Sequence, residues 1–192
     1  ADRPINSPLP AWDIITSYLA TTTILAALQR RTRTGEGAQA RIALSDVALA
    51  TTCNLGILAD YQKSGCVRPR SGNDIYGAFG RDFEILGGRR VMVAAITRRQ
   101  WLNLVRALDI GDALHRLELE LGTDFSDEGC RYVHREPIAA LMRPWFLARP
   151  LTEIGPHFDH CGVSWAPYQS MLETLKSVTR SRYDDSILEA LD

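Results

Sequence analysis

The chain has 192 residues, of which 45% are hydrophobic, so it is long enough to bury a core in one domain or one and a half. Its 22 basic and 23 acidic residues give a formal net charge of -1, which excludes the overall cationic field that holds nucleic acid or an anionic membrane. The four cysteines form no C-x-x-C pair, and nothing resembles a signal peptide or an apolar run of spanning length. We therefore expect a cytoplasmic protein that binds neither nucleic acid nor membranes.

The first part of the chain is predicted to be mainly helical. Three prolines among the first ten residues exclude a helix there, and apolar residues then recur at helical spacing. We expect a long, mostly buried helix from about Asp13 to Arg33, ended by Gly35. Residues 39–44 alternate as in a β-strand, and Ser45 is predicted to cap a second helix that runs to about Tyr61.

A loop rich in glycine, arginine and proline, residues 62–75, is predicted to separate two units. Residues 76–86 and 89–96 then fit two paired strands joined by a turn at Gly87 and Gly88. The rest is expected to be mainly helical. The expected segments are a helix capped by Thr97 and ending at Leu108, a helix from Gly111 to Leu121, a segment from Ser126 to Ala148 bent near Pro137, a helix capped by Thr152 and ending at Cys161, a short segment from Val163 to Tyr168, and a last helix.

Asp13 opens the first long helix, where unpaired backbone N–H groups and the helix dipole favour an ionised carboxylate. Aspartate is a preferred N-cap, and capping alone would explain a residue of this type at this position. The alternative is a carboxylate nucleophile, which needs a rigid mount and an ionised resting state. A helix start meets both needs, so the sequence leaves the two interpretations open.

The segment from Arg70 to Phe83 combines glycines, arginines and aromatic residues, as in a backbone that approaches an anionic ligand. Glycine lets the main chain come close to a ligand, and arginine offers a planar fork to a carboxylate or a phosphate. The plainer interpretation is an ordinary hairpin in which glycines form turns and Arg81 pairs with Asp82 or Asp74. The candidate substrate-binding residues are Arg70, Asn73, Tyr76, Gly77, Gly80 and Arg81.

A metal site is weighed at His157, His160 and Cys161, which are spaced to share one helix face. Zinc usually takes a fourth ligand or a second paired motif, and none is near in the sequence, so we expect no metal. His115 and His134 stand alone and are expected to be solvated or capping residues. Motifs for serine hydrolases, phosphate-binding loops and dinucleotide-binding folds are absent from the sequence.

Four motifs follow one another near the start of the chain. They are Leu9-Pro10-Ala11-Trp12-Asp13, Ile24-Leu25-Ala26-Ala27-Leu28, Arg33-Thr34-Gly35-Glu36-Gly37-Ala38-Gln39 and Ile42-Ala43-Leu44-Ser45-Asp46-Val47. Together they resemble the family III (formyl-CoA transferase-like) CoA-transferases, over about Pro8 to Leu175. The resemblance implies an α/β fold: residues 1–66 supply a long helix, a strand and a helix of a large Rossmann-like domain, residues 67–177 form a small α+β domain, and 178–192 form a tail.

The resemblance also implies a chemistry. Asp13 matches the family's catalytic aspartate, which becomes a mixed anhydride and then an aspartyl-CoA thioester. The substrate is an acyl-CoA, with CoA as a substrate moiety rather than a bound cofactor, and two subunits interlock as a homodimer. In the family a CoA-binding part precedes Asp13 and a C-terminal return follows residue 177. Both lie outside this sequence, so we expect this chain alone to bind CoA weakly and to be inactive.

Three further segments point, within the resemblance, to transfer of CoA from C1 to C4 of one dicarboxylate. They are Gly72 to Phe83, Arg89 to Val93 and Val163 to Tyr168. Such transfer passes through negatively charged intermediates, for which backbone N–H groups around Gly77 and Gly80 are candidate donors, while Arg81 or Arg70 would bind the free carboxylate. The alternatives are an α-methylacyl-CoA racemase-type isomerase, whose histidine base would precede Asp13, and a non-catalytic interlocking module.

Overall fold

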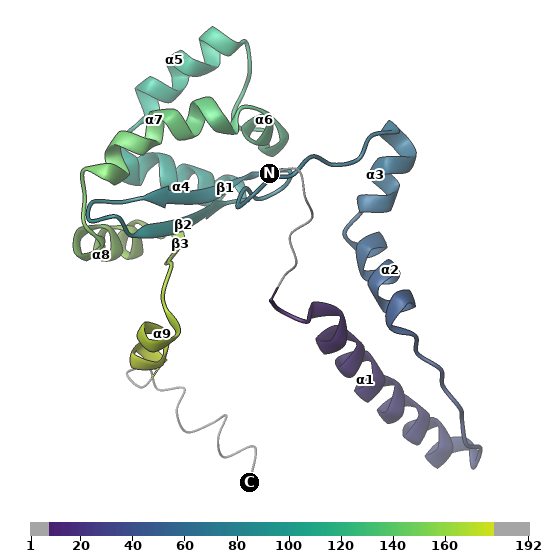
Figure 1. The fold of residues 1–192 in the computed structure, drawn as a ribbon. Coiled ribbons are helices and arrows are strands. Elements are labelled where there is room, and N and C mark those ends of the chain that lie inside the picture. Colours follow the sequence, from purple (N-terminus) through teal and green to yellow (C-terminus); the bar gives the residue numbers. More distant parts are fainter. Residues whose placement is uncertain (1–7, 179–192) are drawn as a thin grey trace. The chain divides into compact units, whose positions relative to one another are not determined.

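The computed structural model describes residues 8–178, with side chains through residue 174. The tail expected at 178–192 lies outside the described residues except for Val178. The chain divides into two compact units, Ala1–Arg70 and Ser71–Asp192. Each unit is described by itself (Figure 1).

The first unit is built around the expected long helix, α1 (Ala11–Thr34). It begins directly after Pro10 and ends at Gly35, whose φ of 75° is accessible to glycine and whose N–H bonds the Arg31 carbonyl at 2.8 Å. The expectation that this helix is mostly buried is wrong, since none of its residues is buried. The described part of the first unit does not cover the apolar side of α1.

Two shorter helices complete the first unit, α2 (Leu44–Asn54) and α3 (Ile57–Ser64). The sequence predicted one helix here, but Gly56 adopts a left-handed φ of 71° and separates the two. Ser45 is not the cap, because α2 begins at Leu44 without a side-chain cap hydrogen bond. The expected strand at 39–44 is wrong as well: residues 36–43 are neither helix nor strand, and no described segment pairs with them.

The apolar character of α1 also corrects an expectation. An 18-residue window in this helix has a mean hydropathy of 1.3, so by length and composition alone α1 meets the criterion for crossing a membrane. The sequence does contain an apolar run of spanning length. Core helices of soluble proteins and N-terminal signal sequences meet the same criterion, which therefore assigns no membrane segment here.

The second unit contains an antiparallel sheet of β1 (Phe79–Glu84), β2 (Arg90–Ala95) and β3 (Ser164–Pro167), in the order β1-β2-β3. The hairpin is confirmed, with Gly87 and Gly88 at φ of 93° and 76° in its turn. Alternate residues such as Phe79 and Phe83 are buried on one face of β1. β1 lies at one edge of the sheet.

Six helices are described in this unit. They are α4 (Arg98–Leu108), α5 (Gly111–Leu121), α6 (Glu128–Val133), α7 (Arg135–Leu147), α8 (Leu151–Cys161) and α9 (Met171–Val178). Figure 1 shows α7 along β1, α4 along β2 and α8 near β3. Phe83 of β1 stacks on Phe146 of α7 at 4.2 Å between ring centroids, and Phe79 packs edge-on against Trp101 of α4. These contacts place the core between the helices and one face of the sheet.

The starts of the helices show which capping signals in the sequence predicted the structure correctly. Thr97 caps α4 in a capping box with Gln100, as expected. The expected bent segment is instead two helices: Asp127 caps α6, and the break falls at His134. Pro137 causes no bend, because it lies in the first turn of α7, where a missing N–H costs nothing. Thr152 is not a cap, since α8 follows Pro150 directly without a side-chain cap hydrogen bond.

Candidate functional site

Asp13 lies on the exposed surface of the first turn of α1. It is not the N-cap, because the helix begins at Ala11 after Pro10 and no side chain caps it. Its carboxylate is therefore not used to hold the helix start. Of the two interpretations of Asp13, the N-cap interpretation is wrong.

The candidate residues are divided between the units. Asp13 and Arg70 belong to the first unit, and the other candidates belong to the second. Within the second unit, Asn73 and Tyr76 lie in the segment that precedes β1, while Gly80 and Arg81 lie on β1 itself. Among the described residues, only the candidates of the second unit lie together, at the outer edge of β1.

The backbone before β1 is attached to this edge. The Ile75 N–H donates to the Gly80 carbonyl at 2.8 Å, and Gly77 turns the chain with a φ of 78°. A Cβ at position 80 would lie 2.3 Å from Ile75 Cδ1 and 2.8 Å from Cγ1, so Ile75 packs where any other side chain would stand. Gly77 and Gly80 thus have conformational and packing roles in forming this edge.

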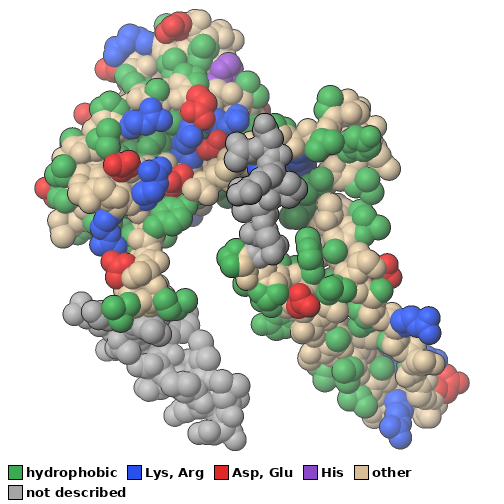
Figure 2. All heavy atoms as spheres, viewed as in Figure 1, with side chains coloured by type: hydrophobic (Ala, Val, Ile, Leu, Met, Phe, Trp, Pro, Cys, Tyr) green, Lys and Arg blue, Asp and Glu red, His purple; other side chains and the backbone are tan. Residues whose placement is uncertain are grey.

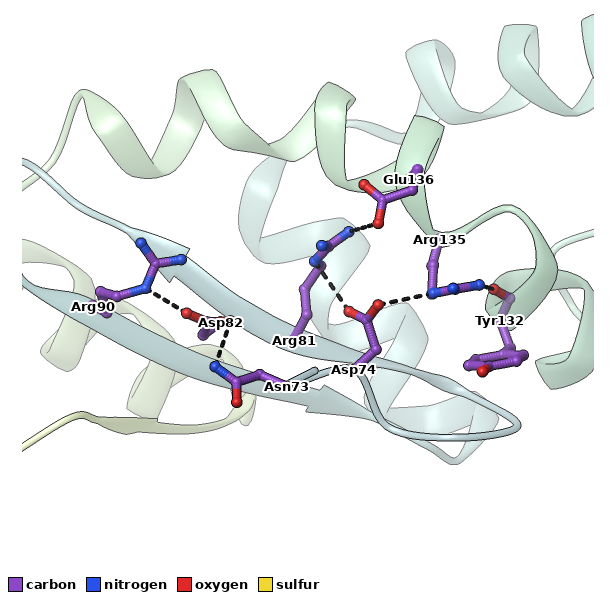
Figure 3. Close-up of polar contacts among 8 residues, drawn as sticks. All are labelled: Asn73, Asp74, Arg81, Asp82, Arg90, Tyr132, Arg135 and Glu136. Carbon is purple, nitrogen blue, oxygen red and sulfur yellow. Dashed lines mark hydrogen bonds and ion pairs between the residues drawn. The ribbon is translucent and has the colours of Figure 1, made fainter. Parts of the chain in front are cut away.

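On the helix-covered face of β1, four charged residues form what we call the Arg81 cluster: Asp74, Arg81, Arg135 and Glu136 (Figure 3). Arg81 Nε lies 3.3 Å from Asp74 Oδ1, and Arg81 Nη1 lies 3.1 Å from Glu136 Oε1. Arg135 Nε donates to the other Asp74 oxygen at 2.8 Å. Asp74 therefore sits between two guanidinium groups, as Figure 3 shows.

The aromatic residues beside this cluster fix Arg135. Its Nη1 donates to the Tyr132 carbonyl at 2.9 Å, and its guanidinium carbon lies 4.5 Å from the centroid of the Tyr132 ring. Tyr132 in turn packs edge-on against the candidate residue Tyr76, with ring centroids 5.1 Å apart. Tyr76 thus contributes to the support of the cluster through Tyr132.

The two carboxylates of the Arg81 cluster differ in burial. The Asp74 side chain is 10% exposed, whereas that of Glu136 is 64% exposed. Contact with Arg81 holds the pKa of Glu136 below its usual range, so this carboxylate is ionised at neutral pH. Arg81 Nη1 is itself buried and has no hydrogen-bond partner of good geometry among the described residues. The guanidinium of Arg81 is neutralised but not fully hydrogen-bonded.

A second group, the Asp82 cluster, lies on the opposite face of β1 and consists of Asn73, Asp82, Glu84 and Arg90. Asn73 Nδ2 donates to Asp82 Oδ1 at 3.2 Å, Arg90 Nε donates to Asp82 Oδ2, and Arg90 Nη1 lies 3.6 Å from Glu84 Oε2. Burial opposes ionisation of Asp82, but the hydrogen bonds from Arg90 and Asn73 outweigh it and keep the Asp82 pKa below its usual value. Arg81 accordingly pairs with Asp74 and not with Asp82.

Sequence reasoning missed Arg135 and Glu136. Arg135 is 61 residues from Asp74 in the sequence. Arg135 and Glu136 lie in the first turn of α7, a helix whose start was not predicted. Among the described residues, no three metal-ligating side chains come together. His157 Nε2 instead lies 2.7 Å from the Ala107 carbonyl.

Comparison with known proteins identifies the family. The model of CoA-transferase family III matches residues 1–184. The chain is 46% identical over 171 residues to 2-methylfumaryl-CoA isomerase of Chloroflexus aurantiacus, covering 89% of this chain and 42% of that protein. It is 31% identical over 137 residues to succinyl-CoA:mesaconate CoA-transferase of Haloarcula marismortui, covering 71% of this chain and 32% of that protein. The chain thus spans less than half the length of these relatives.

Solved structures have the same fold at lower sequence identity. A CAIB/BAIF family protein from Brucella suis aligns with a TM-score of 0.62 at 23% identity, over 91% of this chain and 44% of that one. Rv3272 from M. tuberculosis aligns with a TM-score of 0.67 at 15% identity, over 90% of this chain and 42% of that one. Because the family model matches nearly the whole length of this chain, the chain belongs to CoA-transferase family III.

Proposed function

We propose that the protein moves CoA from C1 to C4 of 2-methylfumaryl-CoA, through an aspartyl-CoA thioester on Asp13. The observation that carries this proposal is the 46% identity to a 2-methylfumaryl-CoA isomerase, which extends over 89% of the chain and includes both units. Mesaconate is 2-methylfumarate, so the relative from Haloarcula marismortui is named for the same acid. The two relatives differ in whether CoA moves within one molecule or between two.

The reaction is acyl transfer without water. The Asp13 carboxylate attacks the C1 thioester carbonyl, and the CoA thiolate leaves, which gives a mixed anhydride between Asp13 and C1. The thiolate then attacks the Asp13 carbonyl, so the aspartyl-CoA thioester forms and the C1 carboxylate is released. The C4 carboxylate next attacks this thioester, and the returning thiolate attacks the C4 carbonyl, which frees Asp13. A thiol with a pKa of about 8.5 is a good leaving group in each direction.

The first turn of α1 suits this role. Asp13 is exposed and makes no cap hydrogen bond, so its carboxylate is available to react. The long helix also gives this carboxylate the rigid mount that a nucleophile needs. Arg81 or Arg70 is proposed to bind the free carboxylate, and backbone N–H groups around Gly77 and Gly80 to stabilise the negative intermediates.

The remaining parts of the proposal follow from the family. CoA enters as a moiety of the substrate, and no separate cofactor is required. The working form is proposed to be an interlocked homodimer in the cytoplasm, without nucleic-acid or membrane partners.

Trapping the intermediate tests the proposal. The full-length protein is incubated with 2-methylfumaryl-CoA and then with hydroxylamine or borohydride, and the tryptic peptide that ends at Arg30 is analysed by mass spectrometry. Trapping is expected to modify Asp13 only when substrate is present, because only the thioester or anhydride reacts.

Two substitutions separate a nucleophile from a structural residue. In the full-length protein, Asp13→Ala and Asp13→Asn are both expected to abolish CoA transfer, since neither side chain can accept the acyl group. Both should change stability by no more than about 0.5 kcal/mol, because Asp13 is exposed and caps nothing. An active Asn variant with unmodified Asp13 would reject the covalent mechanism. Product analysis would then show whether the protein racemises an acyl-CoA or has no catalytic activity.

A further inference from the structure

The two carboxylates that neutralise Arg81 are not equivalent. Asp74 is 10% exposed and is held by both Arg81 and Arg135, with oxygen to nitrogen distances of 3.3 and 2.8 Å. Glu136 is 64% exposed and forms its ion pair with Arg81. A partly buried carboxylate with two cationic partners is costly to move, whereas an exposed ion pair contributes little. Glu136 is therefore the displaceable partner of Arg81.

The contact between Arg81 and Glu136 is also incomplete. Arg81 Nη1 lies 3.1 Å from Glu136 Oε1, yet this buried nitrogen has no hydrogen-bond partner of good geometry among the described residues. A guanidinium binds a carboxylate best through two parallel, well-aligned N–H groups. The geometry at Arg81 thus satisfies the charge of the guanidinium without satisfying its donors, and a better-placed carboxylate would bind in preference to Glu136.

We propose that Glu136 occupies the carboxylate-binding site of Arg81 in the free protein and gives way to the free carboxylate of the substrate. Asp74 and Arg135 stay in place during the exchange and hold the orientation of Arg81. The exchange moves one ion pair and makes or breaks no covalent bond. The identity of the incoming carboxylate rests on the proposed function, whereas the exchange itself rests on the geometry of the Arg81 cluster.

Titration calorimetry with free 2-methylfumarate on the 192-residue chain tests this inference without CoA or turnover. Glu136→Gln is expected to tighten binding about two- to fivefold, because the competing charge is removed while Arg81 remains. Glu136→Asp, which keeps the charge on a shorter side chain, should give a smaller gain. In an Arg81→Gln background, Glu136→Gln should give no gain in affinity.

The matched control is Glu84→Gln. Glu84 is 55% exposed and lies 3.6 Å from Arg90 on the other face of the same strand, so the variant removes a carboxylate of similar exposure from a different arginine. It is expected to leave the affinity unchanged. Equal effects of the Glu84 and Glu136 variants, or weaker binding by Glu136→Gln, would overturn the inference. Circular dichroism confirms that each variant is folded before titration.

The result is separable from the test of Asp13. A trapped Asp13 with no effect of Glu136→Gln would leave the proposed reaction standing and reject the exchange. Tighter binding by Glu136→Gln without trapping of Asp13 would support the exchange and reject the covalent mechanism.

Discussion

Asp74 is the residue on which the Arg81 cluster depends. Its carboxylate lies between two guanidinium groups and is 10% exposed, so Asp74→Asn would leave two partly buried cations with one exposed carboxylate between them. We expect this change to lower the free energy of unfolding of the second unit by about 2 kcal/mol, below the value for a fully buried pair because solvent reaches the cluster.

Urea denaturation followed by tryptophan fluorescence measures this change, with Glu84→Gln as the control. Glu84 is 55% exposed and its contact with Arg90 is long, at 3.6 Å, so its loss should change stability by less than about 0.5 kcal/mol. Equal effects of the two variants would mean that Asp74 has no special structural role.

Asp82 gives the second unit a defined acid sensitivity. Its pKa in the folded protein is held below the ordinary value of 3.8, mainly by the hydrogen bonds from Arg90 and Asn73 that outweigh burial. A lowered folded-state pKa contributes stability that is present above the unfolded-state pKa and is lost as the pH falls through the folded-state pKa. We expect Asp82→Asn to lower stability at neutral pH and to flatten its dependence on pH below about 4.

Thermal unfolding from pH 2 to pH 7 measures the difference between wild type and Asp82→Asn. The two curves should converge at the acid end, where the wild-type carboxylate is protonated too. Parallel curves over the whole range would show that the Asp82 ion pair does not contribute to the pH dependence.

At the scale of elements, the edge of β1 depends on a residue without a side chain. Gly80→Ala would place a Cβ 2.3 Å from Ile75 Cδ1, 2.8 Å from Cγ1 and 3.2 Å from Cβ, so rotation of the Ile75 side chain cannot remove the whole clash. We expect a loss of about 1–3 kcal/mol in the free energy of unfolding. Gly37→Ala, with nothing within 4 Å, is the control and should be close to neutral.

A double variant checks the cause of that loss. Shortening the neighbour in Gly80→Ala/Ile75→Ala removes the clashing atoms, so the double variant should be less destabilised than the sum of the two single variants. Additive losses would show that the clash is relieved in another way.

Elements defined by neighbouring residues were predictable from the sequence. The capping box of Thr97 and Gln100 and the glycine turn of the hairpin need only local chemistry, and both are confirmed. The strand at 39–44 was not, because a strand exists only where another segment accepts its hydrogen bonds, and no described segment does so. The helix break at Gly56 was missed because helical periodicity continues on both sides of it.

The same distinction applies to the candidate site. The pairing of Arg81 with Asp74 was one of two predicted alternatives, since these residues are close in sequence. Arg135 and Glu136 reach the site only because α7 packs along β1, which no local pattern specifies. Strand alternation determines the face of β1 on which the Arg81 side chain lies, whereas tertiary packing determines which residues it contacts there.

At the scale of the whole molecule, the two units differ in how much they bury. Val47 is the one buried residue among those described in the first unit, while the second unit holds the whole core cluster. Figure 2 shows apolar side chains over the surface of α1, α2 and α3. The most exposed of the large ones on α1 are Tyr18 at 73%, Leu25 at 62% and Ile24 at 59%.

Hydrogen exchange measured by mass spectrometry should reveal this difference in the isolated 192-residue chain. Few buried apolar contacts mean low local stability, so amides of α1 to α3 should exchange much faster than those of β1, β2 and α7. The comparison is made at several protein concentrations. Strong protection of α1 at all concentrations would contradict the prediction, and protection that grows with concentration would indicate that a second copy covers the apolar face.

The segment before β1 sends consecutive residues to opposite faces of one strand, Asn73 to the Asp82 cluster and Asp74 to the Arg81 cluster. The hydrogen bond from the Ile75 N–H to the Gly80 carbonyl closes this segment, so inserting or deleting one residue between Asp74 and Arg81 would displace Asn73 and Asp74 from their partners in both clusters. Evolution can therefore replace residues in this segment more readily than it can alter its length. An alignment of family members that keep both clusters should show substitutions here without gaps.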